Sequence, residues 1–208
     1  MRTDFAPKKL PKQTRSRLTF DAIVDACAQL LCERGYGALT INHIAERAGV
    51  SIGSLYEYFS DKDAIVYEVV RRTSHGFSED AAQPLAGFHN MPLRAALRDW
   101  LEALAAAMRS RQELLKAIAE EVPFAIREPH RREAWARHLA LAHTAYRMAG
   151  PRVRQDRVDE VAFLIVTLVD AALNRLFLES PAGVSADDVL DELTQRLSEW
   201  VAPRSRAN

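Results

Sequence analysis

The side chains best suited to binding or catalysis are concentrated in residues 40–59, which read TINHIAERAGVSIGSLYEYF. Hydroxyl groups recur in its second half, at Ser51, Ser54, Tyr56 and Tyr58. Hydroxyls of this kind commonly bond to the phosphate oxygens of nucleic acids. The sequence has no P-loop or GxGxxG motif. Residues 49–53 match the G-x-S-x-G pattern in letters only, because a nucleophile elbow follows a strand and none is predicted here, so these hydroxyls lack the partners that an enzyme site would need. The stretch therefore predicts a binding surface and not a catalytic centre.

The cysteines and histidines do not have the spacing of a metal or redox site. Cys27 and Cys32 would point about 140° apart on one helix, so they should not form a disulfide. Of the six histidines, His138 and His143 are five positions apart, whereas helical metal pairs are three or four apart. We therefore expect no metal, no cofactor and a reducing compartment.

The formal net charge is zero, but the charges are unevenly distributed. Residues 1–20 carry six basic side chains against the single acidic Asp4, which predicts a polyanion as partner. Residues 1–15 also contain two prolines, so we expect a flexible basic arm there. The N-terminus has no signal-peptide core, and the longest apolar run, Phe163–Leu178, is shorter than the roughly 20 residues that span a bilayer. A soluble, cytoplasmic protein with no membrane partner is expected.

Apolar residues recur with helical spacing in every long segment, and no segment alternates as a strand does. The predicted fold is all-α. Ser60 with Asp63, and Ser185 with Asp188, have the spacing of capping boxes. A loop at 82–92 separates an N-terminal domain over 16–80 from a larger helical domain over 81–204. Helices are expected at 19–34, 40–48, 51–59, 61–80, 93–109, 111–121, 130–149, 155–180 and 186–201.

Residues 40–59 also have the arrangement of a helix-turn-helix, in which Gly49 forms the turn between two short helices. Thr40 is a suitable N-cap for the first of these helices. In such a unit the second helix enters the major groove, and its first residues meet base edges. Gly53 allows close backbone approach, and Lys62 adds positive charge in the first turn of the next helix. The expected partner is double-stranded DNA.

Residues 19–70 extend this motif into a long, ordered signature. Its members are Asp25-Ala26-Cys27, Leu30-Leu31, Gly35-Tyr36, Leu39-Thr40, Ile44-Ala45, Ala48-Gly49-Val50-Ser51, Gly53-Ser54-Leu55-Tyr56, Tyr58-Phe59 and Lys62-Asp63. The signature resembles the DNA-binding domain of the tetracycline-repressor (TetR) family of bacterial regulators. The resemblance implies a dimeric transcriptional regulator, expected to be a repressor, that binds a palindromic operator and is released by a small-molecule effector.

The resemblance also implies roles for individual residues. Phosphate contacts are expected from Thr40, Tyr56, Tyr58 and Lys62. Base reading is expected at Asn42 and at the start of the second helix, Ile52, Gly53 and Ser54. Ser51 is a further expected DNA contact, because its hydroxyl suits a phosphate oxygen. Ile52 departs from the polar residues often found there, and could contact a thymine methyl or face the groove without reading it. The basic residues Lys12, Arg15 and Arg17 could reach the minor groove or form a solvated tail.

The helix expected at 155–180 is apolar on more than one face, so a partner subunit could cover one of them. The resemblance implies a dimer through the last two helices. The effector pocket could be lined by the following residues, most of which could equally belong to the plain core: Trp100, Leu104, Met108, Phe124, Trp135, His138, Tyr146 and Phe163. Thr167, Asp170 and Asn174 form a polar stripe that could line the pocket, cross the dimer interface or face solvent. The alternative function is a constitutive or architectural DNA-binding protein without an effector.

Overall fold

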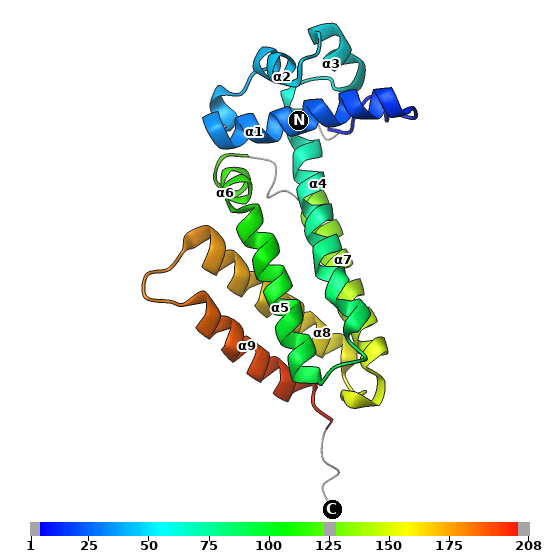
Figure 1. Cartoon of the computed structure of the whole chain (residues 1–208), viewed down its shortest axis with the longest axis vertical. Helices are drawn as coiled ribbons and strands as arrows, with labels where there is room; N and C mark the ends of the chain where they lie inside the picture. Colours follow the sequence, from blue (N-terminus) through cyan, green and yellow to red (C-terminus); the bar gives the residue numbers. More distant parts are fainter. Residues whose placement is uncertain (1–4, 123–127, 204–208) are drawn as a thin grey trace, which may run out of the picture. The chain divides into compact units, whose positions relative to one another are not determined.

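The computed structural model describes residues 5–122 and 128–203, and Figure 1 shows their course. The described residues are helical and contain no strand, which confirms the all-α prediction. The α-helices are α1 (Thr14–Ala38), α2 (Ile41–Ala48), α3 (Ile52–Tyr58), α4 (Lys62–Ala82), α5 (Leu93–Ser110), α6 (Gln112–Glu121), α7 (Glu128–Ala149), α8 (Val158–Asn174) and α9 (Ala186–Val201). Short helical turns follow α4 at Gln83–Gly87 (η1), α7 at Gly150–Arg152 (η2) and α8 at Arg175–Glu179 (η3).

The chain divides into two compact units. Unit 1 comprises Met1–Ser74 and Glu113–His130, and unit 2 comprises His75–Gln112 and Arg131–Asn208. This division differs from the one expected from the sequence, which placed the boundary in the loop at 82–92. The chain is still helical at Ser74, and α4 continues unbroken to Ala82. The boundary therefore falls inside a helix, two residues before Gly76, which does not interrupt that helix.

Unit 1 is built around the apolar face predicted for α1. Ile23, Cys27, Leu30 and Leu31 are all buried there. They share one core with buried residues of α2, α3 and the first part of α4. The helix α6 joins the same core through Ile118, although the sequence placed that helix in the larger domain.

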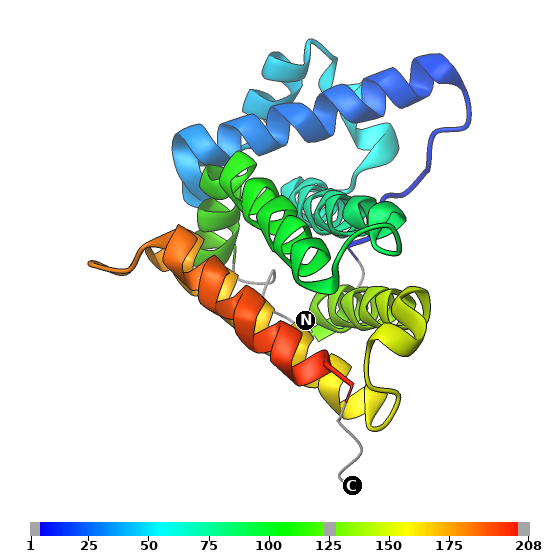
Figure 2. The ribbon, with the colours of Figure 1, turned by 60° about the horizontal axis from the view of Figure 1, so that its bottom comes forward.

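Unit 2 contains the longest apolar helices. In this unit α5 packs along α9, and α8 also contacts α9, as Figure 2 shows. The Gln112 side-chain amide donates a hydrogen bond of 2.7 Å to the Phe177 carbonyl in η3. Ser185 caps α9 by accepting a hydrogen bond from the Asp188 amide, which is one of the two bonds of the predicted capping box.

The segment Val158–Glu179 of α8 and η3 is the most apolar in the described chain. By length and composition alone it could cross a membrane, since its mean hydropathy is 1.9. The sequence prediction had considered only the shorter run Phe163–Leu178, and had found it too short to span a bilayer. A core helix of a soluble protein meets the same criterion. Within the single chain 39% of this segment's most apolar window is buried. Its exposed side chains include Phe163, Leu164 and Leu168, so an apolar face remains uncovered.

Candidate nucleic-acid interface

The helix-turn-helix consists of α2, a tight turn and α3. Thr40 caps α2 by accepting a hydrogen bond of 3.2 Å from the His43 amide, so its own hydroxyl hydrogen stays available for donation. Gly49 ends α2 in the left-handed conformation, with φ of 67° and ψ of 30°. A residue with a Cβ is disfavoured in that conformation, which explains the glycine in the turn. These local signals were all readable in the sequence.

The start of α3 has a free hydroxyl hydrogen. Ser51 caps the helix by accepting from the Ser54 amide at 3.0 Å, and the two hydroxyl oxygens are 2.9 Å apart. Each hydroxyl carries one hydrogen, and their mutual bond uses only one of the two. The other can donate to an acceptor outside the protein. Gly53 between them is exposed, so a phosphate or a base edge can approach the backbone there.

The outer face of α3 carries an apolar group and an aromatic group. Ile52 is 45% exposed and Tyr56 is 44% exposed, and Asn42 on α2 is exposed as well. Tyr58 differs from expectation, because it is only 6% exposed and its ring packs edge-on against Phe20 with the centroids 5.7 Å apart. Tyr58 follows Tyr56 by two positions, which on a helix turns it by about 200° to the inner face. Tyr58 therefore belongs to the core of unit 1.

Lys62 also has a structural partner that the sequence did not indicate. Its ammonium group donates to the Tyr36 carbonyl at 3.0 Å and to the Leu39 carbonyl at 3.3 Å. It also lies 4.2 Å from the centre of the Tyr36 ring. These carbonyls are at the C-terminal end of α1, where a positive charge is favourable. Lys62 thus ties α4 to α1, and this role accounts for it without DNA.

The capping box expected at the start of α4 does not form. Asp61 instead accepts the hydrogen bond of the Ala64 amide at 2.9 Å, and Ser60 donates to Asp61. Asp63, the expected partner of Ser60, accepts a hydrogen bond of 2.7 Å from the Tyr36 hydroxyl. Burial and the Asp63 carboxylate raise the pKa of Tyr36 to about 12.

The described part of the basic arm packs on the helix-turn-helix. The Lys8 amide donates to the Tyr58 carbonyl at 2.8 Å, and its ammonium group donates to the Tyr56 carbonyl at 3.1 Å. The Phe5 ring stacks on Tyr67 of α4, with the centroids 5.8 Å apart. Residues 5–8 thus follow the C-terminal end of α3, a placement that no local pattern indicated. Arg17, in the first turns of α1, is exposed.

An interruption near the end of α1 links it to α6. Gly35 has φ of 72° and ψ of 167°, which breaks the helical hydrogen bonding there. The freed amide of Tyr36 donates a hydrogen bond of 2.7 Å to the Glu121 carboxylate at the end of α6. Tyr36 consequently receives contacts from α4, through Lys62 and Asp63, and from α6. We call Gly35, Tyr36 and Glu121 the α1–α6 junction.

The candidate effector residues in unit 2 have different surroundings. Trp100 and Tyr146 line one apolar pocket, and Leu104 and Met108 are buried. The Trp135 ring packs edge-on against Phe163, and His138 packs against Phe77. Phe124 lies outside the described residues.

The polar stripe on α8 forms hydrogen bonds within its own helix. Thr167 donates to the Phe163 carbonyl at 2.7 Å, and Asn174 donates to the Asp170 carbonyl at 2.8 Å. Thr167 and Asp170 are both exposed, and because they are three positions apart they share one face of α8. This position favours the interface or solvent alternative over a pocket lining.

Comparison with known proteins identifies the N-terminal region. A family described as bacterial regulatory proteins, tetR family, matches residues 23–69. The HTH-type transcriptional repressor KstR2 of Rhodococcus jostii is 41% identical over 58 residues, which are 28% of this chain and 26% of that protein. The A-factor receptor protein of Streptomyces griseus is 30% identical over 132 residues, 50% of this chain and 48% of that protein. The chain thus spans about a quarter to a half of the curated relatives it matches.

Solved structures resemble the fold over nearly the whole chain. A TetR-family transcriptional regulator from Mesorhizobium loti has a TM-score of 0.71 at 20% identity, over 90% of this chain and 96% of that chain. The fatty acid degradation regulator FadR from Bacillus halodurans has a TM-score of 0.65 at 16% identity, over 90% and 96%. At these identities the likeness concerns the fold.

Proposed function

By its N-terminal domain the chain is a member of the TetR family of bacterial regulatory proteins, and from this premise we propose that it is a sequence-specific, DNA-binding transcriptional repressor. The observation that carries the proposal is the uncovered start of α3. Its exposed glycine, free hydroxyl hydrogen and exposed Ile52 and Tyr56 are aligned on one face. Such a helix start can enter the major groove.

Base reading and phosphate binding are assigned to different residues. Gly53 and Ser54 would lie closest to the bases, and Ile52 would contact a thymine methyl. Thr40 and Tyr56 would bind phosphates, because their hydroxyls face outward. Arg17 and the exposed residues of the arm would add charge near the backbone. Tyr58 and Lys62 have structural partners inside unit 1, so we do not assign them a primary DNA contact.

The exposed apolar face of α8 supports a homodimer. Phe163 is 52% exposed, Leu164 49% and Leu168 37%, and Trp200 on α9 is 40% exposed. Large apolar side chains on one helix face commonly mark an interface between proteins. A two-fold dimer would present two copies of α3 to a palindromic operator.

The effector would act by changing which arrangement of the dimer is favoured. A small molecule bound among the helices of unit 2 would stabilise an arrangement that does not fit the operator. To change the ratio of the two arrangements from 1:99 to 99:1, the effector would have to bind one arrangement more tightly than the other by about 5.5 kcal/mol. The protein would work in the cytoplasm, where DNA and effector are both accessible.

The decisive experiment selects bound sequences from random duplex DNA with the purified full chain. About 150 mM salt suppresses non-specific electrostatic binding. We expect enrichment of a palindrome. If the dimer is intact and no sequence is enriched, the chain is not a sequence-specific regulator. Enrichment with no small molecule able to release the DNA would favour a constitutive regulator.

Gly53→Ala tests the assigned face without disturbing the fold. An added Cβ would lie 3.8 Å from the Ser51 hydroxyl oxygen, an ordinary contact, and alanine favours the helix by up to about 1 kcal/mol. The variant should be as stable as the wild type but should bind the selected operator at least tenfold more weakly. Gly37→Ala is the matched control, because nothing lies within 4 Å of an added Cβ there. Equal operator affinity of Gly53→Ala and wild type would contradict the placement of α3 in the groove.

A further inference from the structure

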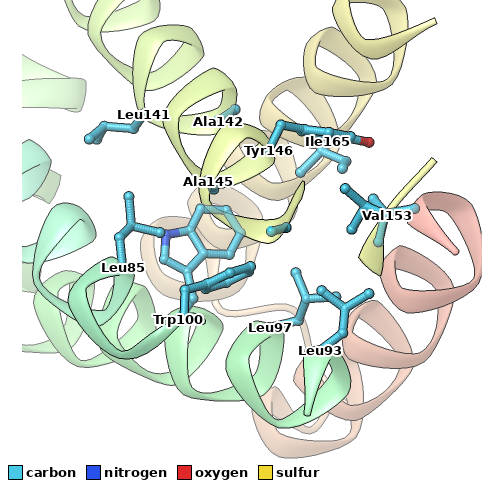
Figure 3. A pocket seen from close by; sticks show the side chains of 13 residues that line it. Leu85, Leu93, Leu97, Trp100, Leu141, Ala142, Ala145, Tyr146, Val153 and Ile165 are labelled. Carbon is cyan, nitrogen blue, oxygen red and sulfur yellow. The ribbon is translucent and has the colours of Figure 1, made fainter. Parts of the chain in front are cut away.

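Unit 2 contains a pocket whose wall is almost entirely hydrocarbon, shown in Figure 3. It is enclosed by η1, α5, α7, α8 and α9, with Leu97, Ala145 and Ile165 among its lining residues. The cavity has a volume of about 60 Å³. Since one water needs about 10–15 Å³ on this scale, the cavity has room for about four to six methylene-sized groups. No charged side chain lines it.

The wall contains one hydroxyl, that of Tyr146, which Figure 3 shows beside Ile165. The Tyr146 side chain is 8% exposed, and its hydroxyl has no hydrogen-bond partner among the described residues. Burial raises the pKa of Tyr146 to about 12, so the phenol remains protonated and can donate at neutral pH. Buried hydroxyls without a partner are uncommon, because burial removes their hydrogen bonds to water. An acceptor atom on a ligand would supply the missing partner.

Val153 in the pocket wall is flanked by Arg152 and Arg154, and both guanidinium groups already have hydrogen-bond or ion-pair partners. Arg152 donates to the carbonyls of Phe88, Met91 and Ala149, at 2.7, 2.9 and 3.3 Å. Arg154 is paired with Asp156. A carboxylate or phosphate placed in the pocket would therefore find neither guanidinium free to neutralise it. Burying an unpaired charge in such surroundings is strongly unfavourable.

We propose that this pocket binds an electrically neutral ligand that has a hydrocarbon body and one hydrogen-bond acceptor, such as an alcohol or an ester, and that this ligand class is the effector. The assignment of the ligand as effector rests on the proposed function. The ligand class itself rests on the lining, the Tyr146 hydroxyl and the committed arginines. Free fatty acids, which are anions at neutral pH, are excluded by the same chemistry.

The test uses 1-alkanols from butanol to decanol and the alkanoates of equal length, titrated into the full-length protein without DNA at pH 7.5. Each added methylene should tighten alkanol binding about fourfold until the cavity is filled at about six carbons. The alkanoates should bind at least tenfold more weakly than the alkanols of equal length. Equal or tighter binding of the alkanoates, or affinity that does not change with alkanol length, would overturn the proposal.

Two variants locate the binding. Ala145→Leu fills the cavity and should weaken hexanol binding at least tenfold, whereas Ala140→Leu, on the exposed side of α7, should not change it. Tyr146→Phe keeps the ring and removes the hydroxyl, so it should weaken hexanol binding several-fold. Unchanged binding in Ala145→Leu would place the ligand elsewhere and refute the assignment.

The effector role is measured separately, by adding hexanol to the complex with the selected operator. Release of the DNA by hexanol, but not by hexanoate, supports the proposal. Binding of hexanol without release contradicts the effector role. If the protein binds no operator at all, the proposed function fails, while the titration without DNA still decides the ligand class.

Discussion

Gly35 is the position where one added methyl group should most disturb the DNA-binding unit. Its φ of 72° and ψ of 167° lie in a region that is almost exclusive to glycine. An added Cβ would also lie 2.8 Å from Oε1 and 2.9 Å from Cδ of Glu121. The carboxylate would have to move, and the Tyr36 amide would then lose its hydrogen bond. Gly35→Ala therefore combines backbone strain with a broken contact.

The two costs can be estimated separately. Backbone strain of this kind costs about 1–3 kcal/mol. A hydrogen bond to a charged group contributes about 1.5–3 kcal/mol, and we take the lower end because Glu121 is exposed. We expect Gly35→Ala to lower the free energy of unfolding of unit 1 by about 2.5–4.5 kcal/mol. The control Gly37→Ala should be neutral or stabilising by up to about 1 kcal/mol.

The assay exploits the distribution of aromatic residues. All three tryptophans, at positions 100, 135 and 200, lie in unit 2, so their fluorescence reports that unit. Urea unfolding followed by far-UV circular dichroism should show an early phase in Gly35→Ala that the tryptophan signal does not share. In a Glu121→Ala background, Gly35→Ala should lower the free energy of unfolding only by the amount of the backbone strain. Equal costs in both backgrounds would refute the reasoning that the carboxylate is displaced.

Three further predictions concern the surface of the protein. Leu168→Glu should convert the proposed homodimer into a monomer at micromolar concentration, measured by light scattering, and a persistent dimer would show that another face is used. Cys32 is exposed and should react with a thiol reagent in the native protein, whereas Cys27, whose pKa is raised to about 12 by burial, should react only after unfolding. If Lys12 and Arg17 contact phosphates, Lys12→Gln and Arg17→Gln should each reduce by about 0.9 the slope of the logarithm of the operator-binding constant against the logarithm of the salt concentration. An unchanged slope would identify a solvated arm.

The helix-turn-helix could be predicted in detail because its signals are local. Thr40 and Ser51 cap helices that begin at the next residue, and Gly49 terminates the helix it follows. Each of these interactions spans three or four residues, so a short stretch of sequence contains all the partners. The alternation of exposed Tyr56 with buried Leu55 likewise follows from helical periodicity.

The roles that sequence reasoning missed depend on partners far along the chain. Lys62 bonds carbonyls 23 and 26 positions away, and Glu121 bonds an amide 85 positions away. Nothing local distinguishes Lys62 from a lysine that faces solvent or phosphate. The capping box at Ser60 failed for a related reason, because Asp63 accepts the hydrogen bond of the Tyr36 hydroxyl, and Asp61 accepts that of the Ala64 amide. Long-range contacts thus give Lys62 and Asp63 partners that the local sequence could not indicate.

The membership of α6 in unit 1 bears on how an effector signal would travel. The chain passes from unit 2 to unit 1 between Gln112 and Glu113, at the start of α6, and that helix ends at Glu121 on the α1–α6 junction. A shift of α6 along its axis would change the support of the Tyr36 amide, and Tyr36 also holds Lys62 and Asp63 of α4. Two of the three helices at which the chain crosses between the units, α4 and α6, therefore meet α1 at one residue, and the third is α7. In the proposed function, an effector that shifts α6 would act through this junction on α1, on which α2 and α3 pack.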